Sequence, residues 1–189
     1  MSWKRSTGIK SGLLALVVCV SCAPAFAQAL SSNTATVVLT ATLGETLTVS
    51  ATPATASITL VSGAAATTTA PVAMTTTWLM NRNRTSVTLF GYFTSATAAL
   101  TDGSSNNIPT SEVFGQVTSG TPTTYTAFTG SGALGTAGAT LTLFTQAITN
   151  ANRASNRSDN LNLKIDLTSQ PQLPAGVYTG TLNLQAQAL

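Results

Sequence analysis

The chain has 189 residues, of which 43% are hydrophobic and only 7% are charged, with eight Lys and Arg residues against five Asp and Glu residues. It contains no histidine, which excludes His-based catalytic triads and His metal ligands. A chain of this length is expected to form one domain with a sizeable core.

The first 27 residues have the pattern of a cleavable secretory signal. Three basic residues are followed by the apolar run 13–20 and by Ala25-Phe26-Ala27, a small-x-small peptidase site. We expect cleavage before Gln28. The alternative is a lipid-modified Cys22, which the Cys residue three positions earlier disfavours. No stretch reaches the roughly 20 apolar residues of a membrane helix, so we expect an exported protein that is not an integral membrane protein.

Removing the signal changes the charge and the cysteine content. Five basic and five acidic residues remain, so the mature chain has no net charge and no electrostatic reason to bind nucleic acid. Cys19 and Cys22 both leave with the signal. The mature chain therefore enters an oxidising compartment without a disulfide, and its stability must come from burial of its core.

Past the signal, the composition favours strands. Residues 34–43 place apolar side chains at the odd positions against Thr34, Thr36, Thr40 and Thr42 on the other face. Gly44-Glu45 interrupts, and the alternation resumes at 47–51 until Pro53 ends it. A strand is expected over 72–80, with Val72, Met74, Trp78 and Met80 on its inward face. Further strands are expected over 57–62, 85–94 (covered on both faces), 111–118, 123–128, 139–148 and 160–168. About eight strands at this spacing predict an all-β fold, an immunoglobulin-like antiparallel β-sandwich.

The last predicted strand alternates up to the final residue of the sequence. Its apolar face carries Tyr178, Leu182, Leu184, Ala186 and Ala188. We expect its outer edge to be uncovered, and an unprotected edge strand favours pairing with another chain.

Catalytic and metal-binding chemistry is poorly represented. Without His and mature Cys, the remaining enzymatic alternative is a carboxylate pair for glycoside hydrolysis, drawn from Glu45, Asp102, Glu112, Asp159 and Asp166. Asp102 falls in a turn, Asp159 begins a strand and Asp166 follows Lys164 on a polar face, so each has an ordinary solvated explanation. Asp102, Ser104 and Asn106 match a calcium loop poorly. We expect no enzyme, no cofactor and no metal site.

The four mature arginines occur in two Asn-rich stretches. They are Arg82, Arg84, Arg153 and Arg157. Guanidinium groups could form a surface contact for an acidic glycan or a neighbouring subunit; the favoured interpretation is solvated connections at the ends of strands.

The segment Pro174-Ala175-Gly176-Val177-Tyr178-Thr179-Gly180-Thr181-Leu182 resembles the final-strand motif of secreted bacterial fimbrial subunits, including the spore-coat-U-like pilins and the broader chaperone–usher class. The resemblance implies a sandwich that lacks one strand. In that family a periplasmic chaperone, and then the N-terminal extension of the next subunit, fills the gap, and an outer-membrane usher exports the fibre. Residues 28–44 would be the extension and 45–189 the sandwich.

The resemblance also implies the residues of the joint. The donor side chains would be Ala35, Val37, Leu39, Ala41 and Leu43, and the acceptor groove would be lined by Tyr178, Leu182, Leu184 and Ala186.

Two hypotheses follow for the function. The first is a structural subunit of an extracellular fibre, or fimbrium, that binds other copies of itself or related subunits. The alternative is a monomeric binding module, with loops around Arg82, Asp102 and Arg153 contacting glycan or protein at the cell surface or in the periplasm. The alternative predicts that residues 34–43 pair within their own domain.

Overall fold

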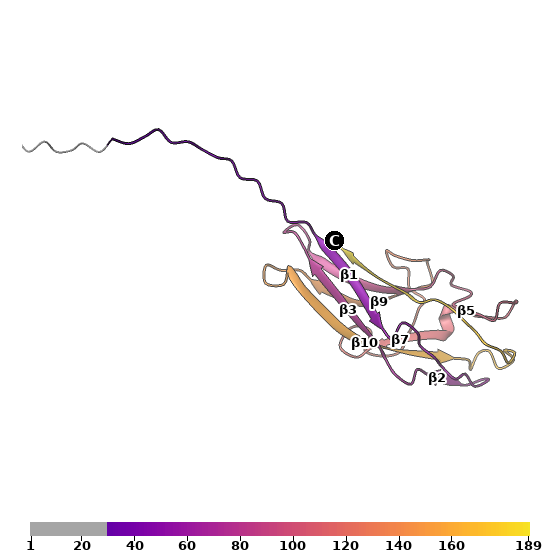
Figure 1. The fold of residues 1–189 in the computed structure, drawn as a ribbon. Helices are drawn as coiled ribbons and strands as arrows, with labels where there is room; N and C mark the ends of the chain where they lie inside the picture. The colour runs from indigo at the N-terminus through magenta and orange to yellow at the C-terminus, as the bar shows by residue number, and fades with distance from the viewer. Residues whose placement is uncertain (1–29) are drawn as a thin grey trace, which may run out of the picture. The chain divides into compact units, whose positions relative to one another are not determined.

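A computed structural model describes residues 30–189, whose path is drawn in Figure 1. The chain divides into two units, one up to Ala41 and one from Thr42 to Leu189. The described part of the first unit contains no strand, and the second unit carries the strands.

The second unit consists of two antiparallel sheets and a short hairpin. The first sheet has the order β1 (Thr46–Thr52), β3 (Val72–Leu79), β10 (Ala154–Asp166), β7 (Val113–Val117) and β8 (Thr126–Ala127), with β2 (Ala65–Thr67) also paired to β10. The second has the order β11 (Asn183–Ala188), β4 (Ser86–Tyr92) and β9 (Thr140–Ala147). The hairpin is β5 (Leu100–Thr101) with β6 (Asn107–Ile108), followed by the 3₁₀ turn η1 (Thr110–Glu112). The predicted all-β sandwich is confirmed.

The strand order reproduces most of the immunoglobulin arrangement. Strands β1, β3, β10 and β7 follow the order A, B, E, D of a constant-type domain, and β11 and β4 follow F and C. Strand β9 lies on the far side of β4 and comes after β7 in the chain. Among the described residues, no strand occupies the position of G beside β11.

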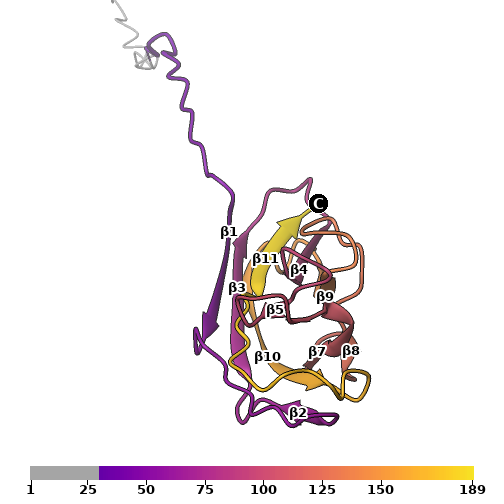
Figure 2. The same ribbon diagram turned by 90° about the vertical axis from the view of Figure 1, so that its right-hand side faces the viewer.

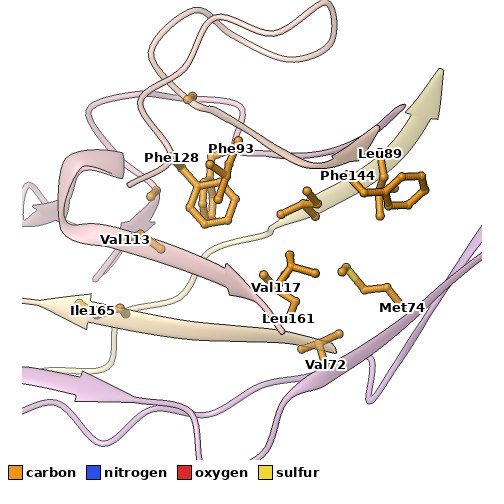
Figure 3. Close-up of a cluster of buried hydrophobic side chains, with 14 of the residues drawn as sticks. Val72, Met74, Leu89, Phe93, Val113, Val117, Phe128, Phe144, Leu161 and Ile165 are labelled. Carbon is orange, nitrogen blue, oxygen red and sulfur yellow. The ribbon is translucent and has the colours of Figure 1, made fainter. Parts of the chain in front are cut away.

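The core lies between the sheets and is filled mainly by alternate residues of β3, β4, β7, β9 and β10, together with Phe93 and Phe128 from the connections (Figure 3). Val72, Met74, Trp78 and Met80 are all buried, as their alternation predicted. Trp78 satisfies its indole N–H by donating to the Asn152 carbonyl at 2.8 Å, as a buried Trp requires.

Strand β4 is buried on both faces, as predicted. Val87 and Leu89 face the core, whereas Phe90 is buried on the other side at 7% exposure. The loop over 130–138 covers that side, because a Cβ on Gly132 would lie 3.1 Å from the Phe90 ring.

Several strand predictions differ from the structure. The final strand, predicted with Tyr178 on its apolar face, begins only at Asn183, and residues 34–43 form no strand. Residues 57–62 form no strand, and only Thr126–Ala127 of 123–128 does. Strand β10 begins at Ala154 instead of 160, because the polar residues before Asn160 pair with β3 over its whole length. The run 154–157 is therefore strand, and its expected role as a solvated connection was wrong.

The solvated explanation of Asp159 was also wrong. Asp159 is 5% exposed and faces inward from the middle of β10. Arg157 donates to its two carboxylate oxygens at 2.7 and 3.1 Å, and Ser119 Oγ donates at 2.8 Å. The Arg157 guanidinium also lies 4.7 Å from the centroid of the Phe144 ring on the opposite sheet. These contacts satisfy the buried charges, so polar side chains can occupy inward positions of β10.

Thr76 provides a first test of the packing. It is fully buried on the inner face of β3, and its Oγ1 has no hydrogen-bond partner among the described residues. Thr76→Val removes that unpaired hydroxyl with little change of shape, so the free energy of unfolding should rise by about 1 kcal/mol in chemical denaturation. Thr77→Val, on the exposed face of the same strand, should change it by less than about 0.5 kcal/mol. A destabilised Thr76→Val variant would contradict this account of the core.

The buried ion pair provides a second test. Asp159→Ala leaves Arg157 and Ser119 without their shared acceptor, so it should lower the free energy of unfolding by about 2–3 kcal/mol, a value reduced because Arg157 keeps partial exposure to water. Asp166→Ala breaks the outward Lys164 pair, whose side chains are 22% exposed, and should cost less. Equal losses of unfolding free energy for the two variants in denaturant titrations would show that the buried Asp159 pair contributes no more to stability than the more exposed Asp166 pair.

Candidate functional site

The two edge strands β1 and β11 lie beside each other on one side of the sandwich (Figure 2). Each is hydrogen-bonded on one side only, β1 to β3 and β11 to β4. The beginning of β1 and the end of β11 line the same cavity, so the two strands run in opposite directions. A groove between two sheet edges is the result.

The core is incompletely covered along this groove. Leu47, Val49 and Ala51 of β1 and the even-numbered residues of β11 pack against the core but stay only half-buried, whereas the inward residues of β3 and β4 are buried. A cavity of about 340 Å³ opens at one end of the groove. It is lined by Glu45, Thr46, Leu47, Met80, Arg84, Ala186, Gln187 and Ala188. Apolar surface is therefore accessible at this end of the groove.

The backbone of β11 is also unpaired on this side. Ser86 and Leu189 exchange both backbone hydrogen bonds, and hydrogen-bonded pairs alternate along an antiparallel ladder. The odd-numbered residues of β11 therefore bond to β4, and Leu184 and Ala186 direct their N–H and C=O groups to the free edge. These groups form a template for an added strand.

Glu45 and Arg84 form an ion pair at the end of the groove. Glu45 Oε1 accepts from Arg84 Nε at 3.2 Å and from the Asn81 backbone N–H at 2.9 Å, and Oε2 accepts from Arg84 Nη2 at 3.3 Å. The hydrogen bond from Arg84, with a smaller contribution from the Asn81 N–H, lowers the pKa of Glu45 below its usual 4.5.

The structure divides the expected acceptor residues between two places. Leu184 and Ala186 lie on the groove face of β11, and Leu182 packs near Gly91 just before that strand. Tyr178 lies elsewhere. Its hydroxyl donates to the Pro174 carbonyl at 2.8 Å, and its side chain lines a separate cavity of about 240 Å³.

Some groove residues were not among the expected site residues. Leu47 on β1, Met80 after β3 and Ala188 on β11 line the cavity. The alternation over 47–51 was the available signal for Leu47, but it gave no indication that β1 lies opposite β11, because the sequence pattern does not specify how the sheets are placed.

The expected donor side chains belong to a segment without secondary structure. Residues 34–43 form no strand within the described chain, and Val37, Leu39 and Leu43 are 81%, 89% and 82% exposed. Ala35 and Ala41 are exposed as well. With Val38, four of the nine exposed large hydrophobic residues of the described chain lie in this stretch, so it is a concentrated exposed apolar segment.

The four arginines are not gathered in one patch. Arg82 and Arg84 lie in the β3–β4 connection, and Arg153 is beside them because its carbonyl accepts from the Met80 N–H at 2.8 Å. Arg157 instead faces the interior from β10. Asp102 lies in the turn between β5 and β6. The adjacent Thr101 forms a β-bridge with Thr179, so this turn lies beside the segment that leads into β11.

Asp102 has the contacts of an ordinary surface turn. Its side chain accepts from the Asn106 amide and from the backbone N–H groups of Ser104 and Asn106. The Asn106 side chain contributes most to lowering its pKa. Within residues 30–189, no three His, Cys, Asp or Glu residues are grouped to hold a metal ion.

The described chain has no helix long and apolar enough to cross a membrane. Compared with models of protein families, with curated proteins and with solved structures, the chain gives no match.

The Glu45–Arg84 pair should make stability depend on pH. A carboxyl whose pKa is lowered by folding stabilises the folded state above its unfolded pKa, and that stabilisation is lost as pH falls through the folded pKa. The stability difference between wild type and Glu45→Gln should thus be largest near neutral pH and shrink below about pH 4.5, the usual value for Glu. Thermal unfolding of both proteins at pH 7, 5, 4 and 3 measures this difference. A constant difference across the series would contradict the pairing.

Proposed function

We propose that the protein is a structural subunit that polymerises by strand complementation, in which residues 34–43 of one copy fill the groove between β1 and β11 of another. The observation that carries the proposal is the open groove edge: β11 offers free backbone groups, and the core-facing residues on both sides stay half-buried. The exported fibre suggested by the sequence resemblance is the setting in which such a subunit would act.

The segment 34–43 is long enough to span this groove, and its pattern suits it. Strand β11 has six residues, or about 20 Å, and ten extended residues span about 33 Å. Ala35, Val37, Leu39, Ala41 and Leu43 alternate with Thr residues at 34, 36, 40 and 42. In a strand that inserts between two sheet edges, such alternation gives one apolar face to the core and one face to water that is hydroxyl-bearing except at Val38.

Strand complementation would bury the exposed apolar side chains of residues 34–43 and pair the free backbone edge of β11 in one step. Burial of a leucine or valine side chain is worth about 1.5–3 kcal/mol, and pairing satisfies the free edge of β11. A second copy supplies the segment at the same concentration as the groove, and repeated head-to-tail pairing gives an open filament.

Matched substitutions on each half of the joint test the proposal. Leu39→Asp places a charge on the apolar face of the segment, and Ala186→Trp fills the groove; each should reduce the assembled fraction at least about tenfold, because either change costs more than about 1.4 kcal/mol. Thr40→Asp and Gln185→Trp alter the opposite faces and should assemble like wild type. Light scattering and electron microscopy of the purified proteins measure assembly.

Mixing the two defective variants distinguishes the joint from general damage. Leu39→Asp retains an intact groove and Ala186→Trp retains an intact segment, so together they should form a dimer that grows no further. A wild-type protein that stays monomeric at all concentrations would overturn the proposal and would favour the binding-module alternative.

A further inference from the structure

Arg84 joins the two edge strands at one end of the groove. Its Nε and Nη2 donate to the Glu45 carboxylate, just before β1, while its Nη1 donates to the Ala188 carbonyl at 3.3 Å. One guanidinium therefore spans from the first sheet to the second. Bidentate, charge-assisted contacts of this kind fix geometry as well as charge.

The Ala188 carbonyl belongs to the free edge of β11. It follows the same alternation as Leu184 and Ala186, whose backbone groups point away from β4. A strand that docks on this edge can bond to Leu184 and Ala186, but at Ala188 it meets an acceptor that Arg84 already occupies. To continue, it would have to displace a hydrogen bond from a charged group and open the Glu45 pair.

We propose that Arg84, held by Glu45, is a positioning residue that ends the acceptor edge at Ala188 and so fixes the register of the incoming strand. This inference rests on the proposed strand complementation. With the end of the groove closed, the same side chain of each incoming strand is placed in the adjacent cavity, beside Leu47, Met80 and Ala186. Regular Thr and Ala repeats specify register weakly by themselves, which is why a fixed end matters for this sequence.

Arg82 is the matched comparison. It lies two residues away in the same turn, is exposed, and donates no hydrogen bond to any residue that the structure describes. An effect of general positive charge at this end of the sandwich should appear equally for both arginines. A positioning effect should appear for Arg84 alone.

Disulfide trapping reads the register directly. Residues 30–189 contain no cysteine, so a cysteine at 186 can be combined with one at 37, 39 or 41 in three double variants of the exported chain. Directly opposite residues approach the Cβ separation of a disulfide, near 3.8 Å, and residues two positions further along do not. Mild oxidation followed by non-reducing electrophoresis then gives the yield of each link between copies.

With Arg84 present, one of the three pairs should dominate its neighbours at least about tenfold, the ratio that one hydrogen bond to a charged group supplies. Arg84→Ala should bring two or more pairs within about threefold of each other, and Glu45→Gln, which leaves Arg84 untethered, should shift yields in the same direction. Arg82→Ala should keep the wild-type pattern. Circular dichroism establishes whether each variant is folded. If Arg84→Ala does not fold, the pattern of disulfide yields in Glu45→Gln tests the positioning role instead.

The outcomes separate this inference from the proposed function. One dominant pair that survives both Arg84→Ala and Glu45→Gln would overturn the positioning role while leaving strand complementation intact. No link between copies in any double variant that retains Arg84 would overturn complementation itself, and the positioning role with it.

Discussion

The sandwich depends on covering one apolar core from both sheets, and that coverage is incomplete along the groove between β1 and β11. Strands in the middle of each sheet bury their inward side chains, as Met74 and Leu89 do. The edge strands β1 and β11 leave theirs half-buried because each is paired on one side only, and no described strand hydrogen-bonds to its outer edge. Hydrophobic burial therefore favours any segment that covers the half-buried side chains of this groove. The proposed assembly would cover the same side chains that folding leaves incompletely buried.

Much of this architecture was predictable from periodicity. The inward residues of β3, the doubly covered β4 and the alternating end of the chain all follow from a two-residue period and from strand-favouring residues. The apolar face of β11 was also predictable. Its orientation toward β1 was not, because alternation identifies a face of a strand but not the strand that lies opposite.

The errors in β10 arose where polar residues occupy inward positions. Arg157 and Asp159 belong to β10 and face the interior, yet their sequence context is Asn, Ser and charge, which usually indicates a loop. Their burial becomes acceptable only through Ser119 and the Phe144 ring, which are distant in sequence. Tertiary contacts of this kind override local propensity. The ion pair between Glu45 and Arg84 was not predictable for the same reason, since 38 residues lie between the two.

Gly44 is the single residue between Leu43, the last of the expected donor side chains, and Glu45, which Arg84 and Asn81 hold in place. One residue spans at most about 3.6 Å. In the proposed polymer, consecutive sandwiches would thus be nearly in contact, with no length of free chain between them to act as a hinge. Such a fibre would resist bending and would offer proteases little accessible backbone at its joints.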